Sequence, residues 1–231
     1  MNSYKTISYY YDEIMEVIEY DLWVDFVKPY FKKDSHILDL ACGSGTFANS
    51  IANLGYKISG LDLSEEIINV AKEKTKMNHN EIDYQVKDMS NFKYDNKFDV
   101  ITCFFDSINF LEENNIKPLF DCVYNHLEDG GYFIFDVFTY SKMKYTNNKT
   151  LKGKLAFAKY KWKMKVKKDV LHHKITIKDN DETIVETYKE YYYDYKKLLD
   201  ERFKVIKVIT DFKNDLNLKK GERILVVLQK W

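Results

Sequence analysis

A glycine turn follows a short, mostly apolar segment near residue 40 and leads into a predicted helix. After His36, residues 37–40 are apolar apart from one acid, Asp39, and they lead into Gly43 and Gly45 and then into a predicted helix from Thr46. Two glycines separated by one residue let the backbone approach a ligand where a side chain would collide. Because Asp39 stands where a buried strand ordinarily carries an aliphatic residue, we expect a ligand with positive charge near the turn.

Two further acids follow at predicted strand ends. The turn alone also fits the dinucleotide pattern G-x-G-x-x-G/A, which is a weak match by itself. Asp62 closes the predicted strand 57–61, and NAD proteins place a ribose-binding acid at a similar distance, so Asp62 does not discriminate. Asp88, followed by Met89, closes the segment 82–86. Since a buried unpaired charge is strongly disfavoured, three such acids indicate a ligand that uses them.

The first part of the chain alternates between predicted strands and helices. Hydrophobic periodicity and capping residues predict helices over 12–30, 46–54, a stretch after Ser64, and 115–127. The predicted strands are 36–40, 57–61, 82–86, 98–104 and 132–138, and 203–210 and 223–230 close the series. This alternation predicts an α/β fold, a Rossmann-like, seven-stranded, mostly parallel sheet with helices on both faces. Ligands of such sheets bind at the carboxyl ends of the strands.

A different periodicity follows the fifth strand. Lysines occupy every odd position from Lys159 to Lys167, and apolar residues occupy the even ones. Such alternation predicts a strand with one wet and one apolar face, and 170–178 and 183–195 follow as further strands. We therefore expect a small antiparallel β insertion between strands five and six. Glu186, Glu190 and Asp194 share one face of the third strand, and we expect them to pair with the lysines.

Charge is divided unevenly along a chain whose net charge is zero. Residues 1–140 hold 12 basic and 24 acidic side chains, and residues 141–231 hold 24 and 12. This asymmetry is compatible with a nucleic-acid surface or with two halves held together by opposite charge. We favour the second, because of the expected lysine–acid pairs. The three cysteines lack metal spacing, and neither a signal peptide nor a membrane span is evident, so we expect a cytoplasmic protein without a metal.

Together these motifs resemble those of the class I S-adenosylmethionine-dependent methyltransferases. The chain is similar to small bacterial members with an antiparallel insertion, relatives of amino-sugar N-methyltransferases and glycine N-methyltransferase. Residues 9–12, Tyr-Tyr-Tyr-Asp, resemble the family's Tyr-Asp signature, and residues 104–111 resemble its fourth motif. Ala41 replaces a glycine of many relatives, which is harmless if its φ is not positive. The Asn/Asp-Pro-Pro-aromatic motif of nucleic-acid amino-methyltransferases is missing, which counts against a nucleic-acid acceptor.

The resemblance implies roles for particular residues. Gly43 and Gly45 border the methionine part of the cofactor, and the backbone of Ala41 contacts its ammonium group, whose charge Asp39 balances. Asp62 accepts hydrogen bonds from the ribose hydroxyls, and Asp88 accepts one from the adenine amino group. Two apolar side chains and two others complete the set of expected cofactor-binding residues: Leu63, Met89, Tyr11 and Cys103.

The resemblance implies a methyltransferase that uses S-adenosyl-L-methionine and methylates N or O of a small-molecule acceptor, as a monomer or homodimer. Candidates for handling the acceptor are Asp106, Asp136, Tyr140 and His172; only one of the adjacent His172 and His173 can face a pocket. The expected division is a cofactor-binding core at 1–140, a substrate flap at 141–197 and closing strands at 198–231. The alternatives are an RNA or protein methyltransferase guided by the basic half, and a non-catalytic cofactor-binding protein.

Overall fold

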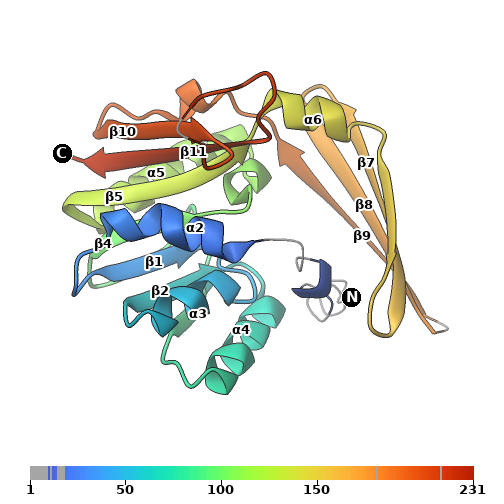
Figure 1. Ribbon diagram of the computed structural model, residues 1–231, viewed down its shortest axis with the longest axis horizontal. Coiled ribbons are helices and arrows are strands. Elements are labelled where there is room, and N and C mark those ends of the chain that lie inside the picture. The colour runs from blue at the N-terminus through green and yellow to red at the C-terminus, as the bar shows by residue number, and fades with distance from the viewer. Residues whose placement is uncertain (1–9, 11, 15–18, 181, 214) are drawn as a thin grey trace.

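The computed structural model describes residues 10, 12–14, 19–180, 182–213 and 215–231, which form two β-sheets and their helices (Figure 1). The larger sheet has seven strands in the order β10-β11-β5-β4-β1-β2-β3. Strands β1 to β5 run parallel, and β11 is antiparallel to both of its neighbours. The strands are β1 His36–Leu40, β2 Lys57–Asp62, β3 Asp83–Val86, β4 Phe98–Cys103, β5 Leu127–Phe138, β10 Phe203–Thr210 and β11 Arg223–Lys230.

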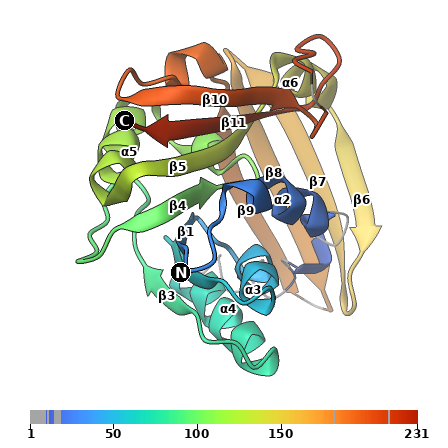
Figure 2. The same ribbon diagram turned by 60° about the vertical axis from the view of Figure 1, so that its left-hand side comes forward.

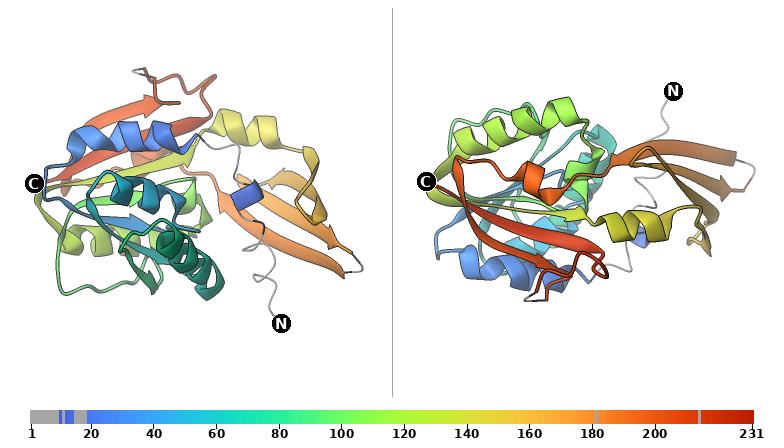
Figure 3. Two further views of the ribbon diagram at one scale, coloured as in Figure 1. Left: turned by 60° about the horizontal axis from the view of Figure 1, so that its bottom comes forward. Right: turned by 90° about the horizontal axis from the view of Figure 1, so that it is seen from above.

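Helices cover both faces of this sheet, because its central strands are apolar at successive positions and bury both faces. Ile37 packs under α2, α3 and α4, whereas its neighbour Leu38 faces α5 and the short helix η3. Figure 3 shows the two helical layers with the sheet between them. The helices are α2 Tyr20–Val27, η1 Lys28–Tyr30, α3 Thr46–Asn53, α4 Glu65–Met77, η2 Ser107–Phe110, α5 Glu113–His126, α6 Tyr140–Thr146 and η3 Tyr195–Leu198.

The smaller sheet is the antiparallel insertion, which we call the flap. It consists of β6 Thr150–Lys154, β7 Ala158–Lys167, β8 Val170–Asp179 and β9 Glu182–Tyr191. It stands opposite the carboxyl ends of the parallel strands, toward which β1 and β4 point (Figures 1 and 2). The expected Rossmann-like fold with an insertion between its fifth and sixth strands is therefore confirmed.

The boundaries differ from the sequence-based expectation at several places. Strand β5 begins at Leu127 and not at residue 132, and the flap has a strand, β6, that was not expected. The helix expected over 12–30 is interrupted at Glu19, which is not helical, so that α2 begins at Tyr20. The third flap strand ends at Tyr191 and not at residue 195, because the chain turns there into η3. Asp194 caps η3 by accepting from the backbone N–H of Lys196 and does not share the strand face of Glu186.

Described residues near the amino terminus connect the flap to the core. The Tyr10 hydroxyl donates to Asp179, and its ring packs with Leu155 and Ile177 of the flap cluster. The carboxylate of Glu13 accepts from the backbone N–H of Ala156. Figure 1 shows this short segment between the two sheets. Within the described part of the chain, no helix has both the length and the apolar character needed to cross a membrane.

Candidate active site

The turn after β1 has the left-handed backbone that its glycines suggest. Gly43 has φ 55° and Gly45 has φ 74°. A Cβ on Gly45 would lie 2.3 Å from the hydroxyl oxygen of Tyr84, so this glycine is required by packing as well as by φ. Ala41 also has positive φ, 53°. The condition under which its replacement of glycine would be harmless is therefore not met, and the strain costs about 1–2 kcal/mol.

Asp39 is a buried acid at the end of β1. Its side chain is 4% exposed, and its Oδ1 accepts one hydrogen bond, from the Thr102 hydroxyl at 2.8 Å. Burial raises the pKa of Asp39 to about 7. The hydrogen bond from Thr102 lowers this pKa, and the charge of Asp62 raises it. A carboxyl held in this way favours a cation beside it, since a positive charge would relieve the penalty of ionising it.

Asp62 joins the glycine turn to the next helix. Its Oδ2 accepts from the backbone N–H of Gly43 at 3.0 Å, and its Oδ1 accepts from that of Ser64 at 3.0 Å. Ser64 in turn caps α4. Burial raises the pKa of Asp62, although these hydrogen bonds lower it. Leu63, beside it, is 72% exposed, which leaves an apolar surface open at the edge of the sheet.

Asp88 and Met89 lie just beyond the end of β3. One carboxylate oxygen of Asp88 accepts from both the backbone N–H and the hydroxyl of Ser90, at 2.8 and 2.7 Å. Met89 is half-buried, and its sulfur lies 3.9 Å from the thiol sulfur of Cys103 at the end of β4. The strand ends therefore bring Asp39, Asp62 and the Asp88–Met89 pair to one edge of the sheet. Tyr11 lies outside the described residues.

An ion pair ties the amino-terminal segment to the glycine turn. The Lys74 ammonium lies 2.6 Å from the Asp12 carboxylate and donates to the hydroxyls of Ser44 and Thr46. The Ser44 hydroxyl donates to Asp12 at 2.5 Å. Since Tyr10 and Glu13 contact the flap and Asp12 contacts Ser44 and Lys74, these three residues connect the flap to the turn that follows β1.

The loop after β4 is held by an arginine. Both oxygens of Asp106 accept from the guanidinium of Arg223, at 2.8 and 2.9 Å, and the same guanidinium donates to the buried Asp136. Phe105 and Asp106 have φ of 61° and 62°, so this clamp holds a left-handed loop in place. With both oxygens engaged by a cation, Asp106 is better suited to positioning the loop than to accepting a proton.

The two adjacent histidines point to opposite faces of the flap. His172 lies on the outer face, opposite Lys165 and Lys189. His173 lies on the other face, which contacts Phe110 of η2 through Tyr188 and which we call the inner face. His173 is 5% exposed. Its Nδ1 accepts from the indole N–H of Trp162 at 2.9 Å, so its Nε2 carries the proton and donates to Glu190 at 3.1 Å. The geometry therefore supports His173, and not His172, as the histidine near the site.

Aromatic rings continue this inner face toward the core. Tyr188 stacks on His173 with ring centres 4.3 Å apart, and Phe110 of η2 stacks on Tyr188 at 5.4 Å. Tyr140, the first residue of α6, is 41% exposed and lies 5.1 Å from the ring of Tyr192. The stacking of Phe110 on Tyr188 therefore joins the inner face of the flap to the loop after β4.

The expected pairing of flap acids with the lysine stripe is wrong. Glu190 pairs with His173, and Glu186 lies opposite Ile175 on the inner face. The strand register explains this, because residues of even number on β9 share a face with the apolar residues of β7 and not with its lysines. The two kinds of charge are therefore separated by the sheet.

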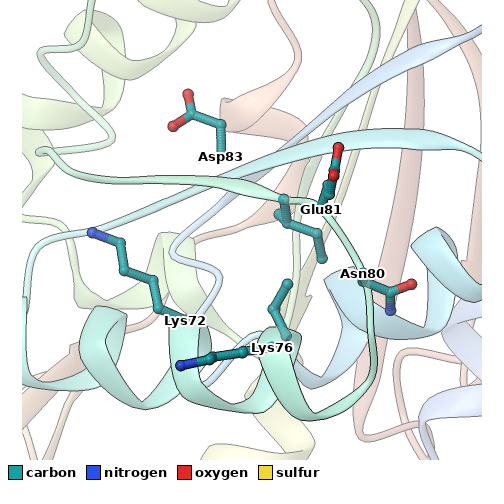
Figure 4. A pocket seen from close by; sticks show the side chains of 7 residues that line it. Lys72, Lys76, Asn80, Glu81 and Asp83 are labelled. Carbon is teal, nitrogen blue, oxygen red and sulfur yellow. The ribbon is translucent and has the colours of Figure 1, made fainter.

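An open hollow lies away from this edge. It has a volume of about 470 Å³ and lies where α4 ends and β3 begins, with Lys72 and Lys76 on one side and Glu81 and Asp83 on the other (Figure 4). None of the predicted site residues lines it. Within the described ranges, no group of three or more His, Cys, Asp or Glu side chains is arranged to hold a metal ion.

Comparison with known proteins finds methyltransferases that match this chain over nearly its whole length. Residues 37–131 match the family model of a methyltransferase domain. A putative methyltransferase of Geobacillus sp. (strain WCH70) is 28% identical over 249 residues, covering 99% of this chain and 100% of that protein. The crystal structure of an S-adenosylmethionine-dependent methyltransferase from Clostridium acetobutylicum ATCC 824 covers 99% of each chain, with a TM-score of 0.85 and 26% identity.

The chain is a class I S-adenosylmethionine-dependent methyltransferase. The resemblance drawn from its motifs and the expected cofactor are thereby confirmed. The structure of the amino pentose methyltransferase CalS10 from Micromonospora echinaspora, with the cofactor bound, shares the fold, with a TM-score of 0.70 and 14% identity over 92% of this chain and 90% of that one. The residues of the methyltransferase fit this cofactor, since a cation would stabilise the ionised form of the buried Asp39 and Leu63 offers an exposed apolar side chain beside Asp62.

Three partners in this site were not predicted from the sequence. Lys74 is one lysine among several in α4, and no sequence signal distinguishes it. Arg223 is one of only two arginines among 36 basic residues, and that rarity is a usable signal for a forked, bidentate contact. His173 was considered only as the neighbour of His172, and the choice between them required the strand register.

Replacing Asp62 by alanine tests its expected role. We expect binding of S-adenosylhomocysteine to weaken by about 1.5–3 kcal/mol for each charged hydrogen bond lost. The free energy of unfolding should fall by only about 1 kcal/mol, because Gly43 and Ser64 lose an acceptor beside solvent. Calorimetry and urea titration measure the two effects. Asp83→Ala, at an exposed acid of β3, is the matched control; affinity unchanged in Asp62→Ala would show that Asp62 is purely structural.

Proposed function

We propose that this methyltransferase methylates the nitrogen of a small-molecule amine held between the flap and the strand ends. The observation that carries the proposal is the inner face of the flap, which combines acids with aromatic rings. Glu186 and Glu190 project from β9 on this face, and Trp162 and Tyr188 lie among them. A cation is the ligand that both kinds of side chain attract.

The two glutamates are suited to a cationic acceptor. Burial raises the pKa of Glu186 to about 7, and within the described residues its buried Oε1 has no hydrogen-bond partner. Burial also raises the pKa of Glu190. The hydrogen bond from His173 lowers this pKa, and the charge of Asp106 raises it. A buried carboxylate with an unpaired oxygen is costly, and an ammonium group of the acceptor would supply the missing donors.

Glu190 is the group that would receive the acceptor's proton. An amine that enters as an ammonium ion must lose a proton before its nitrogen has a free electron pair. His173 cannot take that proton while its Nδ1 accepts from Trp162 and its Nε2–H donates to Glu190. The row Trp162–His173–Glu190 instead fixes the position of the Glu190 carboxylate. A carboxylate with a raised pKa at such a position is a suitable general base.

When bound, S-adenosylmethionine supplies a methyl group activated by attachment to a positively charged sulfur. Asp39, Asp62 and Asp88 would hold its charged and hydroxyl-bearing parts, with Leu63 and Met89 beside the adenine. The flap would exclude water and orient the acceptor, and well-oriented reactants can lower a barrier by roughly 7–11 kcal/mol. In this division residues 1–140 and 198–231 form the cofactor-binding core and residues 141–197 select the acceptor.

The related structures favour nitrogen over oxygen as the accepting atom. CalS10, whose fold matches 92% of this chain, is an amino pentose methyltransferase, which supports nitrogen as the accepting atom. The three free thiols of the described chain support our expectation of a cytoplasmic enzyme. We retain monomer or homodimer as the expected oligomeric state.

Transfer of a radiolabelled methyl group into fractionated cell extract tests this proposal. We expect label in products of low molecular mass that bind a cation exchanger at neutral pH. Label that resists mild base hydrolysis and stays basic would support an N-methyl amine. Label that appears in macromolecules, or in neutral small molecules alone, would contradict the proposal.

A further inference from the structure

The outer face of the flap carries a dense array of lysines. On β7 the five lysines at odd positions from Lys159 to Lys167 all point to this face and are exposed. The register brings five more to the same face from the neighbouring strands: Lys152, Lys154, Lys174, Lys178 and Lys189. No aspartate or glutamate occupies a paired position on this face.

None of these ten ammonium groups has an acidic partner within the described residues. The ion pairs of the described chain use other cations, such as Lys74, Lys142 and Arg223. Several of the ten face each other directly across strands, as do Lys159 with Lys178 and Lys163 with Lys174. Like charges in such positions destabilise a sheet. A polyanion bound to this face would turn the repulsion into attraction.

We infer that the outer face of the flap is a docking surface for single-stranded nucleic acid, bound through its phosphates. Alternate side chains of a strand lie about 6.8 Å apart, so each strand presents a regular row of cations to a linear polyanion. The remaining positions include Thr150, Thr176, Thr183 and Thr187, whose hydroxyls are further donors to phosphate.

The composition of this face disfavours a lipid bilayer as its partner. Surfaces that lie on membranes combine basic residues with large apolar side chains that enter the lipid. At the described positions of this face, Val185 is the exposed large apolar residue, at 45%. Because the side chains of this face are mostly lysine and threonine, contacts to phosphates would dominate, and such contacts carry no sequence information.

A nucleic acid docked here is not the methyl acceptor. The lysines and the inner-face residues Trp162, Glu186 and Glu190 lie on opposite faces of one sheet. The methyl group would be transferred on the side toward the core, whereas the polymer would lie on the far side of the flap. Docking therefore places the enzyme on a polymer without making that polymer its substrate, and the inference does not depend on the identity of the acceptor.

Fluorescence anisotropy with a short labelled single-stranded RNA tests this inference. We expect salt-dependent binding by the intact protein. In a variant with Lys161→Gln, Lys163→Gln and Lys165→Gln, the slope of log affinity against log salt should fall by about two. Affinity for S-adenosylhomocysteine should be unchanged, which shows that the variant is folded. The matched control combines three substitutions at exposed positions outside the flap: Lys33→Gln, Lys57→Gln and Lys97→Gln.

The outcomes separate the alternatives. Loss of RNA binding in the flap variant, with the control variant unaffected, would support the inference. Failure of the intact protein to bind RNA, or equal weakening in both variants, would overturn it. Binding to phosphatidylserine vesicles without binding to RNA would also overturn it and would identify the face as a membrane contact.

Discussion

Replacing Asp39 by asparagine is expected to weaken binding of S-adenosylhomocysteine by about 1.5–3 kcal/mol while stabilising the ligand-free protein at neutral pH. Affinity falls because the carboxylate is the expected counter-charge of the ligand's ammonium group. Stability rises because the buried carboxyl has to ionise without a cation beside it. Asparagine keeps an oxygen that can accept from Thr102, so the local packing is preserved.

The pH dependence of the free energy of unfolding tests the raised pKa of Asp39. The pKa of Asp39 is raised from 3.8 to about 7 in the folded protein. Its contribution to folding is therefore fully present below pH 4 and is lost as the pH rises toward 7. The stability of Asp39→Asn relative to the unmodified protein should increase over this interval and level off above it. Urea titrations of both proteins at several pH values measure the difference.

Asp99→Asn is the matched control for Asp39→Asn. Asp99 lies in β4 and accepts from the backbone N–H of His36, at the opposite end of the sheet. The same chemical change there should leave S-adenosylhomocysteine affinity intact. Full affinity in Asp39→Asn would contradict the assignment of Asp39 to the cofactor's cation. A relative stability that did not vary between pH 4 and 7 would contradict the raised pKa of Asp39.

Replacing Glu190 by glutamine is expected to lower methyl transfer by 10²–10⁴-fold, the usual effect of removing a general base. Cofactor affinity should be nearly unchanged, because Glu190 belongs to the flap and not to the strand ends. In the unmodified enzyme, kcat should rise with pH through a pKa above the ordinary glutamate value, since Glu190 must be ionised to take a proton. This rise should disappear in Glu190→Gln.

Glu182→Gln, at an exposed position of the same strand, is the control for Glu190→Gln. It should transfer methyl groups at the normal rate. A Glu190→Gln variant with normal kcat and an unaltered pH profile would show that the acceptor enters without a proton to lose. A parallel fall in cofactor affinity would instead show that the flap contributes to the cofactor site.

The core fold and the acid-bearing strand ends could be predicted because each depends on local sequence. Continuous apolar strands alternate with capped helices, and Asp39, Asp62 and Asp88 each stand at the end of such a strand. The conformation of Ala41 could not be predicted, because left-handed φ is imposed on it by the turn between Leu40 and Gly43.

The acceptor side of the site depends on contacts between distant segments. Arg223 reaches Asp106 across 117 residues of sequence, and Glu190 meets His173 through the register of two strands. A shift of one residue in this register would exchange the two faces of the flap. Periodicity showed that β7 has one charged and one apolar face, but it did not show which face the acids of β9 would share.

The most direct test of the account is a calorimetric titration of the purified protein with S-adenosylhomocysteine and, separately, with NAD. We assign the acids at the ends of β1, β2 and β3 to an adenosine that bears an amino acid, and we therefore expect one S-adenosylhomocysteine bound per chain and no binding of NAD. Binding of NAD without binding of S-adenosylhomocysteine would contradict it.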